Sequence, residues 1–470
     1  MPSAFDQRGI VNFPTGAAGR SLYCAKAAYL CLGITVVLIW FPEPLALPGG
    51  MSVVTPFMAV AVCIAFRGAR LRAYPVLDRA STRFVAVALA SSAFVLFWSN
   101  ISILNAPEPL RSGRVIVTHF SGAALLVLLY ATFTVERARN LVGLLLILAS
   151  VISALSFVAY FNSTLFAILF ADRDRSNGFF KHANQYGMVL STVAPVGLAL
   201  ALSSQRRLWW LAITAATAFG FIAAGSKTNL LIFAASSSLL LLFAPLLEEE
   251  AARSVFNFFR NLGIGIGVAI IGFASLISFN PRAVRLLTQF FSDEAEVKSL
   301  LSRKALWDYS FEQFYNNPIF GQGAGQMLNV DFGDGPVPHS HNVIIDYMRM
   351  LGVPGLAVCL IFLTAAIIVL CSTIMLAYRA KNASHSDRMM AVGLALGGLA
   401  YIAANMSSDS FGPSTSPFFW LVTYLALFMR TVLSRDSRAR SVRRPRIPDG
   451  RHRVSQISAS KTYQQRSPSL

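Results

Sequence analysis

Long apolar runs that are almost free of charge recur along the whole chain, and they constrain its fold more than any other feature. Each run is long enough to cross the roughly 30 Å hydrocarbon core of a bilayer as a helix. Because a backbone in lipid has to satisfy its own hydrogen bonds, such runs form helices there. The composition agrees, since 55% of the 470 residues are apolar and only 13% are charged. The sequence therefore predicts an all-α integral membrane protein.

The runs predict about 12 transmembrane helices, each recognised by its length and by its lack of charged residues. The predicted spans cover residues 25–41, 51–66, 84–98, 115–133, 141–161, 184–202, 208–224, 229–247, 262–279, 353–377, 389–407 and 418–433. Lys and Arg are concentrated in alternate connections and near the two termini, which predicts that both termini are cytoplasmic.

The distribution of apolar runs and basic residues divides the chain into three parts. Residues 1–24 form a cytoplasmic N-terminal segment, and residues 25–433 form the polytopic membrane domain. Residues 434–470 are basic and rich in Ser and Pro, a composition that predicts a disordered cytoplasmic tail.

The net charge of +18 does not indicate nucleic-acid binding, because the basic residues lie between apolar runs and in the tail, where they orient a membrane protein. The five cysteines lie in or beside apolar runs and lack the spacing of a metal site, so we expect neither a metal nor another cofactor.

One connection is far longer than the others. Residues 280–352 precede the tenth span and fall on the extracytoplasmic side of the predicted topology. Within them, apolar residues recur at helical spacing from Asp293 to Phe314, which predicts an amphipathic helix at the membrane surface. A long connection with structure of its own is usually functional.

Two polar clusters lie at the predicted outer ends of spans, where ionisable residues often mark a site. The first comprises Lys181, which suits a phosphate, and His182, Asn184 and Gln185, which suit sugar hydroxyls. A polar helix start with capping side chains explains this cluster equally well. The second is the turn at Lys227, where the alternative is a lysine that extends to the membrane interface.

The third cluster lies in the long connection itself. Arg303 falls on the predicted amphipathic helix, and His339, His341 and Asn342 stand directly before the apolar stretch that begins at Val343. A histidine at the mouth of a membrane helix suits a general base at neutral pH. Helix capping is the alternative for His341. Two histidines with no third ligand nearby do not indicate a metal site.

In order and spacing, these segments resemble the O-antigen ligase and polysaccharide polymerase superfamily, slightly closer to the polymerase branch that includes the exopolysaccharide-production proteins of rhizobia. The resemblance covers residues 177–360 and departs from the family pattern at Lys227, where arginine is usual, and at Arg349, where many members have an acidic residue. It is carried by the glycine-rich stretch with His182 and Asn184-Gln185, by Ser226-Lys227-Thr228, by Arg303 and Trp307 followed by Pro318, Gly321 and Gly323, and by His341-Asn342 followed by Gly352 and Gly355.

The resemblance implies a metal-independent glycosyltransferase in the bacterial inner membrane, with its active site facing the periplasm. Its donor would be glycan on undecaprenyl diphosphate, and its acceptor a lipid-linked repeat or the lipid A core; chain-length or export proteins are candidate partners. Cations have to hold the diphosphate, and Arg303, Lys227 and Lys181 are the candidates. His341, as the base, and Arg303 would carry catalysis, while His182, Asn184, Gln185 and Asn342 would bind glycan. We expect these groups to converge at the extracytoplasmic rim.

Two other functions remain open at this level. Twelve spans with both ends inside suit a transporter or flippase of lipid-linked oligosaccharide, although the two halves of the chain show no similarity of the kind that transporters often have. A non-catalytic scaffold in an envelope assembly complex is the third possibility.

Overall fold

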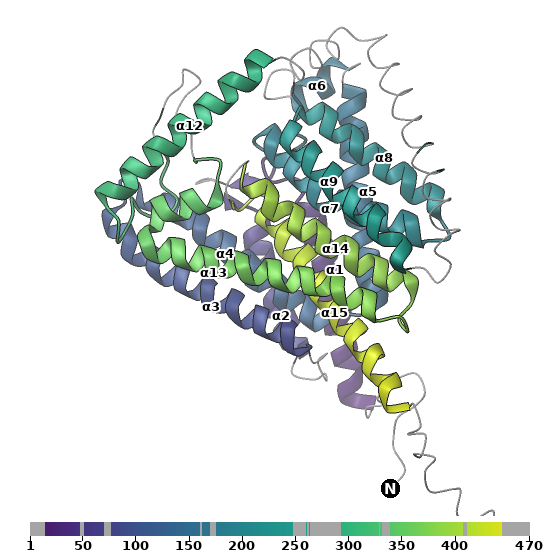
Figure 1. The fold of residues 1–470 in the computed structure, drawn as a ribbon. Helices are drawn as coiled ribbons and strands as arrows, with labels where there is room; N and C mark the ends of the chain where they lie inside the picture. Colours follow the sequence, from purple (N-terminus) through teal and green to yellow (C-terminus); the bar gives the residue numbers. More distant parts are fainter. Residues whose placement is uncertain are drawn as a thin grey trace, which may run out of the picture.

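The structure, a computed structural model, is a bundle of helices (Figure 1). Among the residues that it describes, eight helices are long and apolar enough to cross a membrane, and three shorter helices are also apolar. The chain is therefore an all-α membrane protein. The described residues are 15–47, 51–69, 77–159, 162–169, 175–247, 260, 263, 293–328, 330, 339–407 and 411–443.

Every predicted span except one corresponds to a described helix, because apolar length is the property that selects a membrane helix. The exception, residues 262–279, lies outside the described residues. The helices are α1 (Thr15–Leu38), α2 (Val54–Ala69), α3 (Arg79–Ser102), α4 (Gly113–Thr132), α5 (Val135–Ala159), α6 (Ser163–Leu169), α7 (Ala183–Ser203), α8 (Arg207–Ala224), α9 (Lys227–Leu247), α12 (Asp293–Asn316), α13 (Val343–Arg379), α14 (His385–Asn405) and α15 (Ser416–Arg443). Two 3-10 turns, η1 (Ile103–Asn105) and η2 (Pro109–Ser112), and one short antiparallel pair, β1 (Ala46–Leu47) with β2 (Met51–Ser52), complete the described elements.

Three helix ends differ most from the prediction. Helix α1 begins at Thr15, inside the predicted N-terminal segment, and α15 continues to Arg443, inside the predicted tail. Helix α13 begins at Val343 rather than at residue 353, because the side chain of Asn342 caps it and a bend at Gly352 lets the helix continue into the span. The helix predicted for residues 293–314 is present as α12.

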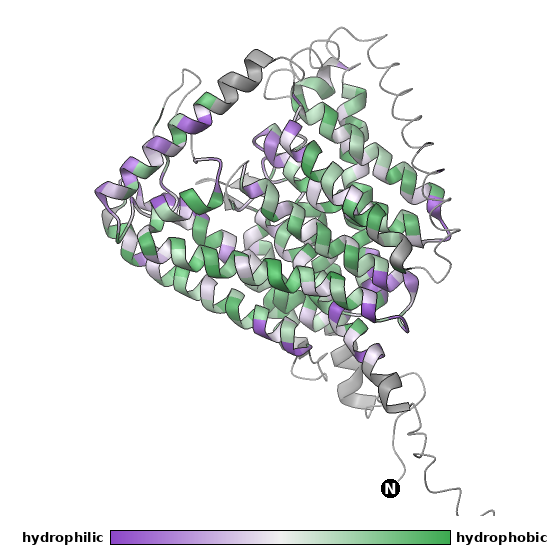
Figure 2. Ribbon diagram, in the orientation of Figure 1, coloured by the Kyte–Doolittle hydropathy of each residue, from purple (hydrophilic) through white to green (hydrophobic). Residues whose placement is uncertain are grey.

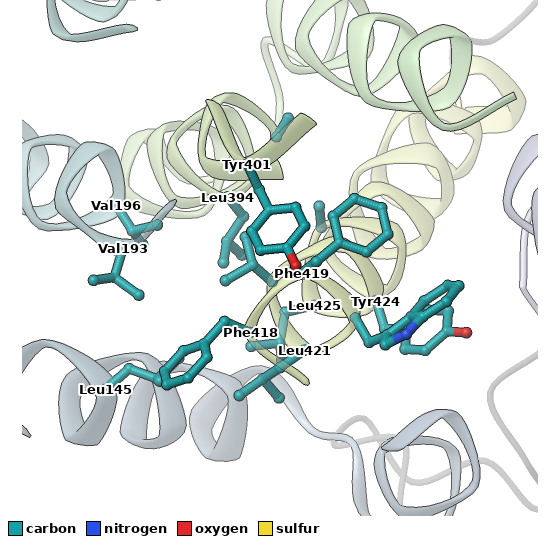
Figure 3. Close-up of a cluster of buried hydrophobic side chains, with 14 of the residues drawn as sticks. Leu145, Val193, Val196, Leu394, Tyr401, Phe418, Phe419, Leu421, Tyr424 and Leu425 are labelled. Carbon is teal, nitrogen blue, oxygen red and sulfur yellow. The ribbon is translucent and has the colours of Figure 1, made fainter. Parts of the chain in front are cut away.

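Helices α7, α14 and α15 form the centre of the bundle, and most of their residues are buried. Figure 3 shows Val193, Leu394, Tyr401 and Phe418 meeting there with side chains of neighbouring helices. Glycines allow the closest approach, since a Cβ on Gly397 would lie 2.2 Å from the carbonyl oxygen of Thr192 on α7. Small residues at such positions are typical of helices that associate within membranes.

The two ends of the bundle differ in character. Helix α12 lies at one end, away from the C-terminal end of α15, which points towards the opposite end (Figure 1). Hydrophobic residues cover most of the bundle helices, whereas hydrophilic residues gather at helix ends and on α12 (Figure 2). The starts of α7 and α13, beside which predicted polar residues lie, line one cavity, and Trp307 of α12 contacts the turn before α13.

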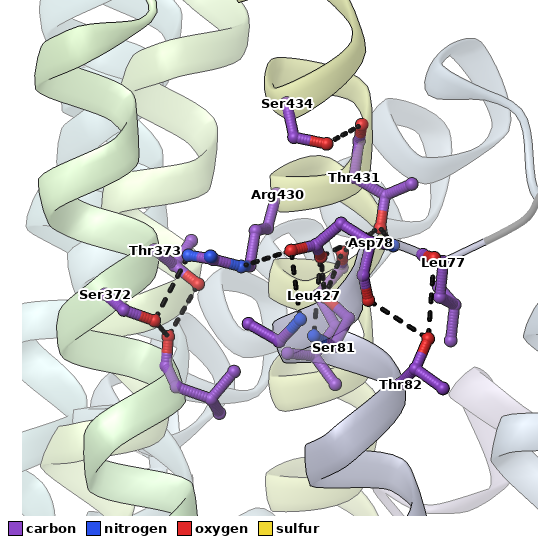
Figure 4. A network of polar contacts seen from close by, with 12 residues as sticks. Leu77, Asp78, Ser81, Thr82, Ser372, Thr373, Leu427, Arg430, Thr431 and Ser434 are labelled. Carbon is purple, nitrogen blue, oxygen red and sulfur yellow. Dashed lines mark hydrogen bonds and ion pairs between the residues drawn. The ribbon is translucent and has the colours of Figure 1, made fainter.

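A polar network joins three helices at the opposite end (Figure 4). Asp78 caps α3 by accepting from the backbone N–H groups of Ala80 and Ser81, and it pairs with Arg430 of α15 at 3.1 Å. Arg430 also donates to the hydroxyl of Ser372 on α13 at 3.1 Å. One carboxylate therefore stabilises a helix start and an interhelical contact together.

We expect Asp78→Ala to lower the free energy of unfolding by about 1–3 kcal/mol, because it removes a helix cap and leaves a largely buried guanidinium without its partner. Thermal unfolding of detergent-solubilised protein would measure the loss. Glu136→Ala is the control, since Glu136 is an exposed acid in the first turn of α5. Equal melting temperatures for the two variants would contradict the role of Asp78.

Candidate functional site

The start of α13 is shaped by a bend at Gly352, whose φ of 67° and ψ of −159° interrupt the helix. The bend leaves three successive carbonyl groups, those of residues 349–351, without their usual helical donors. They accept instead from the N–H groups of Gln322 and Gly323 and from the indole of Trp98, at 2.9, 3.1 and 3.0 Å. The long connection is thus hydrogen-bonded to the bend.

The glycines of this connection allow it to lie against its neighbours. Gly321, Gly323 and Gly325 all have positive φ, which favours glycine. A Cβ on Gly325 would lie 2.3 Å from the carbonyl oxygen of Arg111, in the connection between α3 and α4. The hydroxyl of Ser112 donates to the carbonyl of Ala324 at 2.9 Å. The glycine spacing that supports the family resemblance is therefore explained by packing.

The turn that carries the two histidines is held on both sides. The N–H of Ser340 donates to Asp346 Oδ1 at 2.9 Å. The carbonyl of Ser340 accepts from the indole of Trp307 on α12 at 2.9 Å. The rings of His339 and His341 lie 4.6 Å apart, and His341 has a φ of 58°, which is uncommon for a residue with a side chain. Strained backbone of this kind is often found at functional sites.

Arg303 belongs to α12, whose Trp307 contacts this turn, and Asn342 follows the turn as the N-cap of α13. Arg303 lies on α12 one helical turn before Trp307, so both side chains share the face that meets the turn. Its partial burial lowers the pKa of the Arg303 guanidinium, which still remains charged at neutral pH. The Asn342 side chain caps α13 through its oxygen and donates to the carbonyl of Met406 at 3.2 Å. Asn342 therefore has a structural role, in addition to the glycan contact that was predicted for it.

A cavity of about 250 Å³ opens beside the turn, between the start of α7, the start of α13 and the neighbouring ends of α1, α2 and α4. Three predicted residues line it, namely Lys181, His182 and Gln185, and His339 lines it as well. His182 stands at the N-cap of α7 but makes no capping hydrogen bond with its side chain. The capping explanation of this cluster therefore does not account for His182.

Charged residues from four segments meet around the cavity. Arg114 at the start of α4 and the exposed Lys181 supply positive charge, and the exposed Glu43 supplies negative charge. Asp346 and Arg349 of α13 line the same cavity and are fully buried. The cavity therefore combines a cationic side, suited to an anionic group, with a buried pair of opposite charges.

Asn184 of the first cluster and the turn at Lys227 lie together, away from the cavity residues of α7. The side-chain oxygen of Asn184 accepts from Arg175 Nη2 at 2.8 Å, and Arg175 Nε donates to the carbonyl of Ala224 at 2.9 Å. The backbone carbonyl of Asn184 accepts from Asn229 at 3.2 Å. These contacts fix the turn that carries Lys227 against the start of α7, so the first and second clusters are neighbours.

The structure thus brings the predicted residues to one end of the bundle but not into one cavity. Lys181, His182 and Gln185 line the cavity, whereas Arg303, Lys227 and His341 are not among its lining residues. The expected convergence of Arg303, Lys227 and His341 is therefore not seen at this cavity. Arg303 lies on α12, which packs against α13, and Lys227 begins α9, which packs against α7, so both come from helices that do not line the cavity.

Sequence reasoning missed Arg114 and Asp346, and it treated Arg349 only as a departure from a family pattern. A signal was available, because Asp346 and Arg349 are ionisable residues within an apolar stretch and such residues are usually functional. Among the described residues, no group of three or more His, Cys, Asp and Glu side chains is arranged to hold a metal ion.

Comparison with known protein families gives one match. Residues 184–360 match the family model of O-antigen ligase, a stretch that runs from α7 through the histidine turn to the bend of α13. No curated protein matches the chain. The matched stretch contains Lys227, Arg303 and His341, and the match supports a membrane function in joining or polymerising glycan. The chain is therefore a multi-pass membrane protein in which residues 184–360 match the O-antigen ligase family, as the resemblance to the O-antigen ligase and polysaccharide polymerase superfamily predicted.

Proposed function

We propose that this protein is a glycosyltransferase that moves glycan from undecaprenyl diphosphate to a second glycan at the periplasmic face of the bacterial inner membrane. One observation carries the proposal: cationic and imidazole groups from α4, α7 and the histidine turn surround one cavity at a single end of a membrane bundle. Both termini would be cytoplasmic, since the start of α1 and the end of α15 lie towards the other end (Figure 1).

The reaction breaks the bond between the anomeric carbon of the donor sugar and the diphosphate oxygen, and it forms a bond from that carbon to an acceptor hydroxyl. The leaving diphosphate keeps the electron pair, so its growing negative charge needs fixed cations. Lys181 and Arg114, which line the cavity, would supply them. Arg303 and Lys227 would hold the diphosphate from the neighbouring elements, and no metal ion is required in this scheme.

The acceptor hydroxyl loses a proton as the new bond forms. His341 is the proposed base, because an imidazole is partly unprotonated at neutral pH and its ring lies beside His339 at the cavity. His182 and Gln185 would orient the glycan from α7, and Asn184 would do so less directly because its oxygen is engaged by Arg175. Diphosphate is a good leaving group, so positioning contributes strongly to the rate.

A reconstituted reaction tests the proposal. Purified protein in proteoliposomes, supplied with undecaprenyl-diphosphate-linked glycan and an acceptor glycan, is expected to release undecaprenyl diphosphate and lengthen the acceptor. We expect His341→Ala to lower that rate by about 10²-fold or more through loss of proton transfer. His385→Ala is the control, because His385 begins α14 at the opposite end of the bundle.

Different results would support the other functions. Movement of intact lipid-linked glycan across the bilayer with no new glycosidic bond would indicate a transporter. Absence of both transfer and movement would indicate a scaffold. If impermeant reagents label α12 only from the cytoplasmic side, the proposed periplasmic site is wrong.

A deletion strain separates the two branches of the superfamily. Single repeats that stay on the lipid carrier would identify a polymerase, because chain growth would be the missing step. Long chains that stay on undecaprenyl diphosphate would identify a ligase, because transfer to the final acceptor would be missing. Analysis of the glycan released from the lipid fraction makes the distinction.

A further inference from the structure

Two oppositely charged side chains at the start of α13 line the cavity, and nothing in the proposed chemistry uses them. Asp346 and Arg349 are both fully buried, and Asp346 Oδ1 lies 3.6 Å from Arg349 Nη2. They stand one helical turn apart, directly before the bend at Gly352. Buried charges are costly, so the positions need a reason beyond local structure.

Other contacts fix the orientation of both side chains. Arg349 Nη2 donates to the carbonyl of Gln326 at 2.8 Å, and Nη1 lies 3.4 Å from the carbonyl of Met327 and from the side-chain oxygen of Gln313. Asp346 Oδ1 accepts from the N–H of Ser340. The guanidinium and the carboxylate are therefore held in place from outside the pair.

This arrangement leaves one polar atom on each partner unused. Among the described residues, Arg349 Nε and Asp346 Oδ2 have no hydrogen-bond partner. Buried polar atoms in folded proteins are almost always paired, and charged groups most of all. A pair that served only to stabilise α13 would gain most by closing into a tight contact, whereas these two groups stay 3.6 Å apart.

The unused atoms are one donor and one acceptor on adjacent side chains. Neighbouring hydroxyl groups of a pyranose ring match them, since one hydroxyl can accept from the guanidinium while the next donates to the carboxylate. A phosphate does not match, because the Asp346 carboxylate would repel it. The cavity of about 250 Å³ is also somewhat smaller than most small-molecule pockets and suits one sugar residue rather than a polyprenyl chain.

We propose that Asp346 and Arg349 form a saccharide subsite that binds hydroxyl groups of one pyranose residue of the glycan substrate. The subsite deepens the proposed function and rests on it for the identity of that substrate. Lys181 and Arg114 then serve the anionic part of the substrate, and the buried pair serves its neutral part. Because Asp346 also holds Ser340, a bound sugar contacts the same carboxylate that orients the histidine turn.

The test is direct binding of simple sugars to the full chain in lipid nanodiscs. Methyl glycosides of glucose, galactose and mannose are the probes, and saturation-transfer NMR is the readout. We expect at least one glycoside to bind the unaltered protein. The double variant Asp346→Asn with Arg349→Gln should weaken that binding about tenfold or more, because hydrogen bonds to charged groups are lost.

Removing both charges avoids leaving one of them buried without a partner, which is the change that most threatens folding. Asp387→Asn is the control, since Asp387 pairs with Arg139 at 2.7 Å in a contact outside the cavity. If the double variant does not keep its melting transition, Asp346→Asn alone carries the test, because the amide oxygen still accepts from Ser340.

Two results would overturn the subsite: no glycoside binds the unaltered protein, or a folded variant binds within about twofold of it. The reconstituted reaction separates the two proposals. Glycoside binding that depends on the pair, without any glycan transfer, would keep the subsite and reject the proposed function. Where transfer occurs, a raised KM for the acceptor alone assigns the sugar to the acceptor, and a raised KM for the donor alone assigns it to the donor.

Discussion

Replacing Arg303 with alanine is expected to lower the rate of glycan transfer by about 10²–10³-fold, the loss typical when one charge-stabilising group is removed. Arg303 lies one turn before Trp307, and the indole of Trp307 is bonded to the turn that carries His341. A guanidinium there would meet the departing diphosphate next to the proposed base. The measurement is undecaprenyl diphosphate release at saturating donor, with protein level and melting temperature recorded for each variant.

Two variants make this result specific. Lys304→Ala removes a neighbouring charge from an exposed position of the same helix and should change the rate less than about threefold. Arg303→Lys keeps the charge but loses the two-pronged contact with phosphate, so we expect an intermediate rate. Equal activity of the Arg303→Ala and Lys304→Ala proteins would remove Arg303 from the reaction.

Replacing Gly352 with alanine is expected to destabilise the protein by about 3 kcal/mol, near the upper end of single substitutions. The residue has a φ of 67°, and an added Cβ would lie 2.2 Å from the carbonyl oxygen of Ile319. The carbonyl oxygen of Ile319 is a backbone atom, so it cannot move away by a change of side-chain rotamer. Because the bend positions Arg349 and the glycine-rich connection, we also expect the folded fraction to lose activity.

Thermal unfolding followed by size-exclusion chromatography would measure the change. Gly33→Ala is the matched control, since Gly33 lies in α1 with open space around it and alanine favours a helix. The control should melt at the same temperature as the unaltered protein or slightly above it. A Gly352→Ala protein that melts with the control would show that the bend is not needed.

Much of the membrane domain could be predicted because hydropathy is a local property. All predicted spans but the one at residues 262–279, which lies outside the described residues, and the helix at residues 293–314 correspond to described helices, since apolar length and helical spacing can be measured along the chain alone. The family resemblance was equally local: short segments in a fixed order, confirmed by the match over residues 184–360. The start of α13 was predicted wrongly because the cap at Asn342 and the bend at Gly352 act together, and neither is an apolar signal.

The sequence by itself determined that the chain is a helical membrane protein with the motifs of this superfamily in residues 184–360, and it named most of the candidate cations and the histidine. Only the tertiary structure decided which of them share a cavity. Arg114 and Glu43 come from segments without a recognised motif, and they join Lys181 and the Asp346–Arg349 pair because helices distant in the chain pack side by side. That packing depends on close contacts such as the one between Gly397 and Thr192, whose partners no local pattern reveals.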